Sequence, residues 1–155
     1  MDLREALLRE TVATVGFRSL ASIEVGAKVR DAVRIMQRDK IGAIVVTEDD
    51  AVRGIFTERD LVVRVLQQEG GLDGNVDDVM TRDPHVAHDN DPICSVLSTM
   101  HEKGLRHLPV LDSENRPLGT ISIKRAVHFL ASNMPQAIYN LPPEPDQFPA
   151  RPEGG

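Results

Sequence analysis

The heptapeptide Gly54-Ile55-Phe56-Thr57-Glu58-Arg59-Asp60 has a second, altered copy in the same chain, Gly119-Thr120-Ile121-Ser122-Ile123-Lys124-Arg125. A glycine begins both copies, and a hydroxyl side chain follows three positions later in each. The copies differ at the last position, where the carboxylate Asp60 is replaced by the cation Arg125. A repeat of this kind indicates a duplicated structural unit. Its altered position indicates where the two units differ in function.

The stretches before each heptapeptide repeat as well. Apolar side chains fall at positions i, i+3, i+4 and i+7 in residues 29–36 and again in 93–100, the spacing of an amphipathic helix with one buried face. Each predicted helix is followed by two short apolar runs with a polar turn between them, which predict a pair of strands. These strands are expected at 43–46 and 52–56 in the first copy, and at 108–111 and 117–121 in the second.

A leading strand and a closing helix complete each unit as β-α-β-β-α. The leading strands are expected near 23–25 and 86–88. The closing helices are expected to bury Val62, Val65 and Leu66 in the first unit, and Val127, Leu130 and Ala131 in the second. A unit of about 55 residues with three strands is too small to bury both faces of its sheet. We therefore predict an α+β fold in which two units pack face to face with pseudo-twofold symmetry.

The chain of 155 residues is long enough for one compact domain or for two small fused ones. The predicted divisions are an N-terminal helix at 1–10, a first unit at 11–70, a second unit at 75–132 and a tail at 133–155. Six of the ten prolines lie in the tail, between positions 135 and 152, so we expect the tail to be irregular.

Composition and motifs argue against several classes of function. The net charge of −6 disfavours a general nucleic-acid surface, and no apolar run approaches the roughly 20 residues of a membrane span. Cys94 is the only cysteine, which rules out an internal disulfide and fits a reducing cytoplasm. The five histidines share no metal-binding spacing, and the chain has no Walker A loop, GxGxxG fingerprint or GxSxG elbow. Neither a metal site nor an enzyme is therefore expected.

Thr57 and Asp60 fit a [ST]-x-x-[DE] capping box at the start of the helix expected around 58–66. In this structural interpretation the hydroxyl accepts a backbone N–H, and the carboxylate stabilises the helix start. The same pair could also bind a ligand, because a carboxylate can accept hydrogen bonds from two hydroxyl groups at once. Gly54 and Gly119 are expected to allow close packing of the strands.

Tandem units carrying G-h-h-[TS]-x-x-D resemble cystathionine β-synthase (CBS) domains, and the pair is similar to a Bateman module. The resemblance covers about residues 10–131, and the segments 57–60 (TERD) and 104–110 (GLRHLPV) look like those of stand-alone bacterial CBS-pair proteins. It implies regulatory binding of AMP, ADP or ATP between the units, with S-adenosylmethionine or NAD(H) as further candidates, and no catalysis. It also implies a homodimer that signals by conformational change to a separate effector protein.

The resemblance implies particular site residues. Asp60 matches the family's ribose-binding aspartate, and Thr57 matches the hydroxyl beside it. The phosphate candidates are Arg59, Arg106 and His107. Solvated surface charge is the ordinary role of any one arginine, so each of these has that alternative. The apolar slot for adenine is expected from Ile23, Ala43 and Ile44.

The second copy departs from the family pattern at Ser122, Lys124 and Arg125. Ser122 keeps the hydroxyl, but an arginine has no acceptor for a ribose hydroxyl. Three hypotheses remain open: an empty site with Arg125 in solvent, an anion contact by Lys124 and Arg125, or a salt bridge from Arg125 to the other unit or subunit. One nucleotide site at Asp60 is therefore expected instead of two equal sites. The alternative function is a dimerisation or protein-interaction module without a nucleotide.

Overall fold

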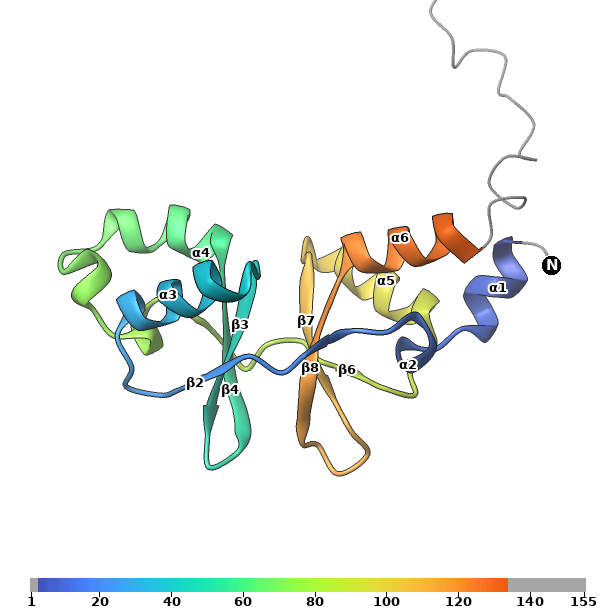
Figure 1. Cartoon of the computed structure of the whole chain (residues 1–155), viewed down its shortest axis with the longest axis horizontal. Coiled ribbons are helices and arrows are strands. Elements are labelled where there is room, and N and C mark those ends of the chain that lie inside the picture. The colour runs from blue at the N-terminus through green and yellow to red at the C-terminus, as the bar shows by residue number, and fades with distance from the viewer. Residues whose placement is uncertain (1–2, 134–155) are drawn as a thin grey trace, which may run out of the picture.

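Two four-stranded sheets stand next to each other in the middle of the molecule, and helices cover the outer side of each (Figure 1). The computed structural model describes residues 3–133. The sheets have the strand orders β2-β3-β4-β5 and β1-β8-β7-β6, and they touch through β3 with β8 and β4 with β7. This face-to-face arrangement of two similar halves is the one that the repeat predicts.

The predicted β-α-β-β-α order is confirmed in both halves. The first half contains β2 (Ser22–Glu24), α3 (Val29–Asp39), β3 (Ala43–Glu48), β4 (Ala51–Thr57), α4 (Glu58–Val63) and the 3-10 helices η1 (Val65–Gln67), η2 (Gly71–Asp73) and η3 (Val76–Asp78). The second half contains β6 (Ala87–His88), α5 (Ile93–Lys103), β7 (His107–Leu111), β8 (Pro117–Ser122) and α6 (Ile123–Asn133). The remaining elements are α1 (Leu3–Arg9), α2 (Val12–Val15), β1 (Arg18–Ser19) and β5 (Thr81–Arg82).

The helical stripes pack as their spacing predicts. The residues that α3 and α5 bury are Val29, Ala32 and Met36, and Ile93, Val96 and Met100. Each stripe packs on the outer face of its own sheet. The central strands β3 and β7 accordingly carry nearly continuous runs of buried apolar residues. Such a strand packs against helices on one face and against the second sheet on its opposite face. Because both faces are buried, it does not show the alternation of apolar and polar residues.

Each sheet has a fourth strand that the three-stranded units do not supply. β1 pairs antiparallel with β8, although it precedes the first unit in the chain. β5 pairs antiparallel with β4, although it follows the first unit and precedes the second. Each added strand hydrogen-bonds to a strand that would otherwise be an open sheet edge, and open edges are prone to pairing with other chains.

The added strands bring neighbouring residues with them. Val12 and Val15, which the sequence assigns to the first unit at 11–70, are buried in the core of the second half. Val76 and Val79, which the sequence assigns to the second unit at 75–132, are buried in the core of the first half. The halves that pack in space therefore differ from the units of the sequence by two exchanged segments, 12–19 and 76–82.

In each half the repeated glycine lies where the exchanged strand pairs with its neighbour in the sheet. A Cβ on Gly54 would collide with the sulfur of Met80 and lie 2.9 Å from the carbonyl oxygen of Thr81. A Cβ on Gly119 would collide with the carbonyl oxygen of Arg18. The packing role expected for both glycines is confirmed, and the neighbour that requires it is the exchanged strand in each case.

The predicted burial of the closing helices is wrong at several positions. Val62 is 62% exposed and Leu66 is 76% exposed, whereas Val65 is buried. In the second half Val127 is 57% exposed, and the buried residue is its neighbour Ala126. The cause in the first half is that α4 ends at Val63 and η1 continues with a different pitch. Ala131 is also exposed.

The predicted N-terminal helix at 1–10 corresponds to α1. The irregular tail predicted at 133–155 lies outside the described residues, apart from Asn133 at the end of α6. None of the helices within residues 3–133 has the length and apolar character that a bilayer span requires.

We expect Gly119→Ala and Gly54→Ala each to lower the free energy of unfolding by about 1–3 kcal/mol or more, because the added methyl group meets fixed backbone of an exchanged strand. Urea denaturation followed by circular dichroism measures the change. Gly74→Ala is the matched control, because Gly74 has a φ of −70° and its Cβ would lie 3.4 Å from the nearest atom, the Gly71 carbonyl oxygen. Equal stability of all three variants would contradict the packing role.

Candidate functional site

A cleft of about 970 Å³ lies between the two halves. One wall comes from the end of β4 and from α4, in residues 57–60 and 63–64. The opposite wall comes from the end of α5 and the start of β7, in residues 103–108. Residues 81–85, which include the exchanged strand β5, complete the lining. The volume is within the range of roughly 300–1,000 Å³ that small-molecule sites occupy.

Thr57 and Asp60 form the capping box that their spacing predicts. The Thr57 hydroxyl accepts a hydrogen bond from the backbone N–H of Asp60 at 3.3 Å. In return, the Asp60 Oδ2 atom accepts hydrogen bonds from the Thr57 backbone N–H at 2.9 Å and from the Thr57 hydroxyl at 3.0 Å. These bonds fix the orientation of a carboxylate that is only 7% exposed but lines the cleft.

Arg64 fixes the other side of the Asp60 carboxylate. Its Nε atom lies 3.6 Å from Asp60 Oδ1, and its Nη1 atom donates to the carbonyl oxygens of Met80 at 2.8 Å and Val79 at 3.3 Å. An ionised carboxylate offers about four acceptor positions. Two hydrogen bonds go to Oδ2 and one longer ion pair goes to Oδ1, so Oδ1 keeps acceptor capacity for a hydroxyl donor in the cleft.

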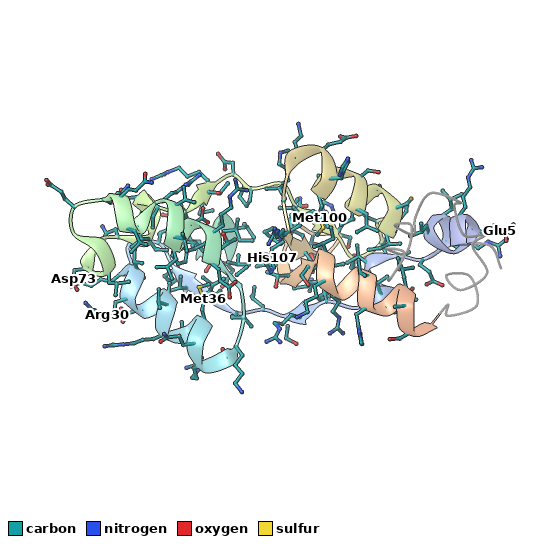
Figure 2. The ribbon with its side chains drawn as sticks, turned by 90° about the horizontal axis from the view of Figure 1, so that it is seen from above. Glu5, Arg30, Met36, Asp73, Met100 and His107 are labelled. Atoms are coloured by element: carbon teal, nitrogen blue, oxygen red, sulfur yellow. The ribbon has the colours of Figure 1, made fainter. Side chains whose placement is uncertain are left out.

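The three predicted phosphate residues all line the cleft. Arg59 approaches from the first half, and Arg106 and His107 approach from the second. Figure 2 shows His107 at the inner edge of the second half, toward the first half. Their convergence supports the prediction that residues from both repeats share one site.

His107 lies over Gly42 together with Glu58. A Cβ on Gly42 would lie 3.4 Å from the imidazole Nε2 atom and 3.5 Å from the carboxyl carbon of Glu58. Burial lowers the pKa of His107, the nearby Glu58 carboxylate raises it, and Arg106 lowers it further. The net effect is a lowered pKa for His107, which favours the neutral imidazole at about pH 7.

The three residues predicted for the adenine slot, Ile23, Ala43 and Ile44, lie away from the cleft lining. Ile44 is fully buried in the core of the first half, Ile23 packs against that core, and Ala43 is 3% exposed. None of the three lines the cleft. Ile44 and Ile23 fill the core between α3 and the sheet, whereas Ala43 is buried outside that cluster. The apolar side chains that do line the cleft are Ile55, Val63, Pro84, Leu105 and Leu108.

Several lining residues were missed by the sequence argument. Glu58 is inside the quoted heptapeptide, and Lys103 precedes the quoted segment 104–110. Residues 81–85 enter the site because β5 pairs with β4 directly behind the capping box. The signal that could have found them is the repeated glycine, since it indicates a backbone that approaches β4 closely.

The altered second site lies outside this cleft. The Ser122 hydroxyl accepts the backbone N–H of Arg125 at 3.1 Å, so the hydroxyl cap is kept without the reciprocal carboxylate. The Arg125 side chain is exposed and packs over Gly16, where a Cβ would lie 2.9 Å from its Nη2 atom. Arg18 of the paired strand β1 donates from its Nη1 atom to the carbonyl oxygen of Asp39 at 3.0 Å. Within residues 3–133 neither Lys124 nor Arg125 forms an ion pair.

We expect acid to destabilise the protein through His107. Because burial lowers the folded-state pKa of His107, the unfolded chain binds a proton more readily as the pH falls through the ordinary histidine range. The destabilisation is therefore absent at about pH 7.5 and grows toward about pH 5.5. Between about pH 7.5 and about pH 5.5, the melting temperature of His107→Gln should fall by less than that of the wild type. His128→Gln, at an exposed histidine of α6, is the control, and identical behaviour of both variants would refute the assignment.

Comparison with known proteins identifies the repeated unit. The family model described as CBS domain matches residues 12–67 and 76–132. The crystal structure of a CBS-domain containing protein from Agrobacterium tumefaciens is 31% identical, with a TM-score of 0.69 over 77% of this chain and 98% of that chain. Among curated relatives, this chain spans only 24% and 23% of two CBS domain-containing proteins of Arabidopsis thaliana, at 28% and 24% identity.

Two further solved structures contain ligands. A CBS domain protein from Pyrobaculum aerophilum, complexed with AMP, is 21% identical with a TM-score of 0.69, over 79% of this chain and 99% of that chain. The CBS domain pair of a protein solved with 5′-methylthioadenosine and S-adenosyl-L-methionine is 18% identical with a TM-score of 0.72, over 80% of this chain and 98% of that chain. At these identities the likeness shows a shared fold.

Proposed function

This chain belongs to the CBS domain family, and we propose that it is a regulatory sensor that binds an adenine nucleotide or a related adenosyl ligand between its two CBS units. The observation that carries the proposal is the Asp60 carboxylate. It is buried, held by a capping box and an arginine, and keeps acceptor capacity on a cleft whose opposite wall is cationic. The proposal includes no catalytic step.

Each part of a nucleotide has a matching group in the cleft. Asp60 Oδ1 accepts from the ribose hydroxyls, with the Thr57 hydroxyl beside it. The apolar side chains from β4, α4 and β7 provide the surface for the adenine ring. Arg59, Arg106 and His107 face the phosphate, where arginine can bind two oxygens at once. The adenosyl ligands of the two related structures support this class of ligand, and the residues of this cleft support it independently.

The ligand signals by favouring one arrangement of the two halves. Its ribose end contacts α4 of the first half, and its phosphate end contacts the α5–β7 segment of the second. Such a ligand binds most tightly when the two walls are at one particular separation, so it shifts the equilibrium toward that arrangement. An effector protein that contacts both halves then reads the change.

The assembly proposed for this sensor is a homodimer through α4 and α6. Both helices lie along the same side of the molecule (Figure 1). Each exposes an apolar side chain at a pseudo-equivalent position, Val62 on α4 and Val127 on α6. A second copy would cover this apolar face with its own equivalent face, as twofold interfaces do.

We expect Val62→Lys combined with Val127→Lys to convert the dimer to a monomer, because two charges would be buried against an apolar partner face. Sedimentation velocity measures the mass. Gln37→Lys, at an exposed polar position of α3, is the control and should leave the dimer intact. A wild type that is monomeric, or a double variant that stays dimeric, would refute this interface.

We expect Asp60→Ala to weaken nucleotide binding at least about tenfold, which corresponds to about 1.4 kcal/mol, and Arg125→Ala to leave it nearly unchanged. Calorimetric titration with AMP, ADP, ATP, S-adenosylmethionine and NAD(H) measures both. Asp60→Asn tests the same position with a side-chain oxygen that can still cap α4, and circular dichroism checks the fold of all variants.

Equal losses in Asp60→Ala and Arg125→Ala would show that the ligand occupies a different site. A wild-type protein that binds none of these ligands at millimolar concentration would refute the sensor. In that case the exposed apolar face of α4 and α6 would favour the dimerisation or protein-interaction module.

A further inference from the structure

The cleft carries an excess of positive charge. Five arginine and lysine side chains line it, against three carboxylates, in a protein whose net charge is −6. The cations are Arg59, Arg64, Arg82, Lys103 and Arg106, and the carboxylates are Glu58, Asp60 and Asp83. The local excess is opposite in sign to the charge of the whole chain, so the chain's overall composition does not account for it.

Two of these cations are already occupied by the fold. Arg64 donates to the carbonyl oxygens of Val79 and Met80 and pairs with Asp60. Arg82 Nη2 donates to the carbonyl oxygen of Asp77 at 3.1 Å. Arg64 therefore ties the exchanged segment 76–82 to Asp60 of α4, and Arg82 braces the segment internally, so both arginines have structural partners.

The other three cations are free for a ligand. The side chains of Arg59, Lys103 and Arg106 are exposed, and none forms a hydrogen bond or ion pair with another residue in the described range 3–133. They come from both walls. Arg59 is adjacent to the proposed ribose anchor Asp60, whereas Lys103 ends α5 and Arg106 precedes β7. Gly104, with a φ of +64°, turns the chain between the last two.

We propose that this cleft selects nucleoside di- and triphosphates over nucleoside monophosphates and over adenosyl sulfonium compounds, with Lys103 and Arg106 binding the outer phosphates. This inference rests on the proposed function, because it requires the ribose at Asp60. A phosphate chain that leaves the ribose beside Arg59 must cross toward the second half to reach the remaining free cations. A longer phosphate chain offers more oxygen atoms to the cations of both walls than a single phosphate does.

The charges of the candidate ligands decide the order of affinity. Each added phosphate brings negative charge to a site with two unbalanced positive charges, and charge-assisted hydrogen bonds are roughly twice as strong as neutral ones. The sulfonium of S-adenosylmethionine instead brings a positive charge next to unpaired cations, which is unfavourable. Glu58 repels a phosphate chain, and neutral His107 can donate one hydrogen bond but brings no charge, so the discrimination rests on the free cations.

The test is a calorimetric titration with AMP, ADP, ATP and S-adenosylmethionine in buffer without divalent cations. We expect ATP to bind at least about tenfold more tightly than AMP, and S-adenosylmethionine to bind more weakly than AMP. The advantage of ATP should shrink as salt is added, because exposed ionic contacts are screened. Lys103→Ala should lower ATP affinity about fivefold and leave AMP affinity within twofold. Lys28→Ala, at an exposed lysine outside the cleft, should change neither.

The contrary results separate this inference from the proposed function. Equal wild-type affinities for AMP and ATP, or equal losses for both ligands in Lys103→Ala, would overturn the selection while nucleotide binding stands. Tighter binding of S-adenosylmethionine than of ATP would overturn it as well, with an adenosyl site retained. Failure of all four ligands to bind would overturn the proposed function and this inference together.

Discussion

The close approach of β1 and β5 to two glycines, Gly119 and Gly54, determines how the two halves of this molecule are assembled. Gly54 and Gly119 are the positions where β4 and β8 pair with β5 and β1, and a side chain there would collide with the paired strand or the residue before it. Because β5 pairs closely with β4, residues 81–85 line the cleft. The need for glycine at position 54 and the lining of the candidate site therefore both result from the pairing of β5 with β4.

Hydrophobic periodicity was sufficient to predict the repeated core. The stripes of α3 and α5 and the apolar runs of β3 and β7 have strong patterns over many residues, so their type and order followed from the sequence. The exchanged strands β1 and β5 are two residues long each, which is too short for a period to appear. The positions of the closing helices in the chain were predicted correctly, but the face that each buries was not. Val62, Val65 and Leu66 are all apolar, and only tertiary packing selects Val65 for burial.

The candidate site was predictable where chemistry and spacing coincide. Thr57 and Asp60 have the reciprocal geometry that their motif requires, and Arg59, Arg106 and His107 meet in one cleft. The adenine slot was not predictable in the same way, because an apolar strand residue such as Ile44 looks the same whether it faces a ligand or the core. The unpaired state of Lys103 is a property of three-dimensional surroundings that no single stretch of sequence contains.

The exchanged segments also govern how the chain can fold. β1 pairs with β8 across about a hundred residues of sequence, so the second sheet is completed by one of the longest-range contacts available to the chain. High contact order of this kind slows folding, because a long loop must close before the pairing stabilises it. Residues 18–19 can pair only with β8, the last strand in the described range of the chain. Because the two CBS units exchange strands and core residues, we expect them to fold and unfold together although they repeat in sequence.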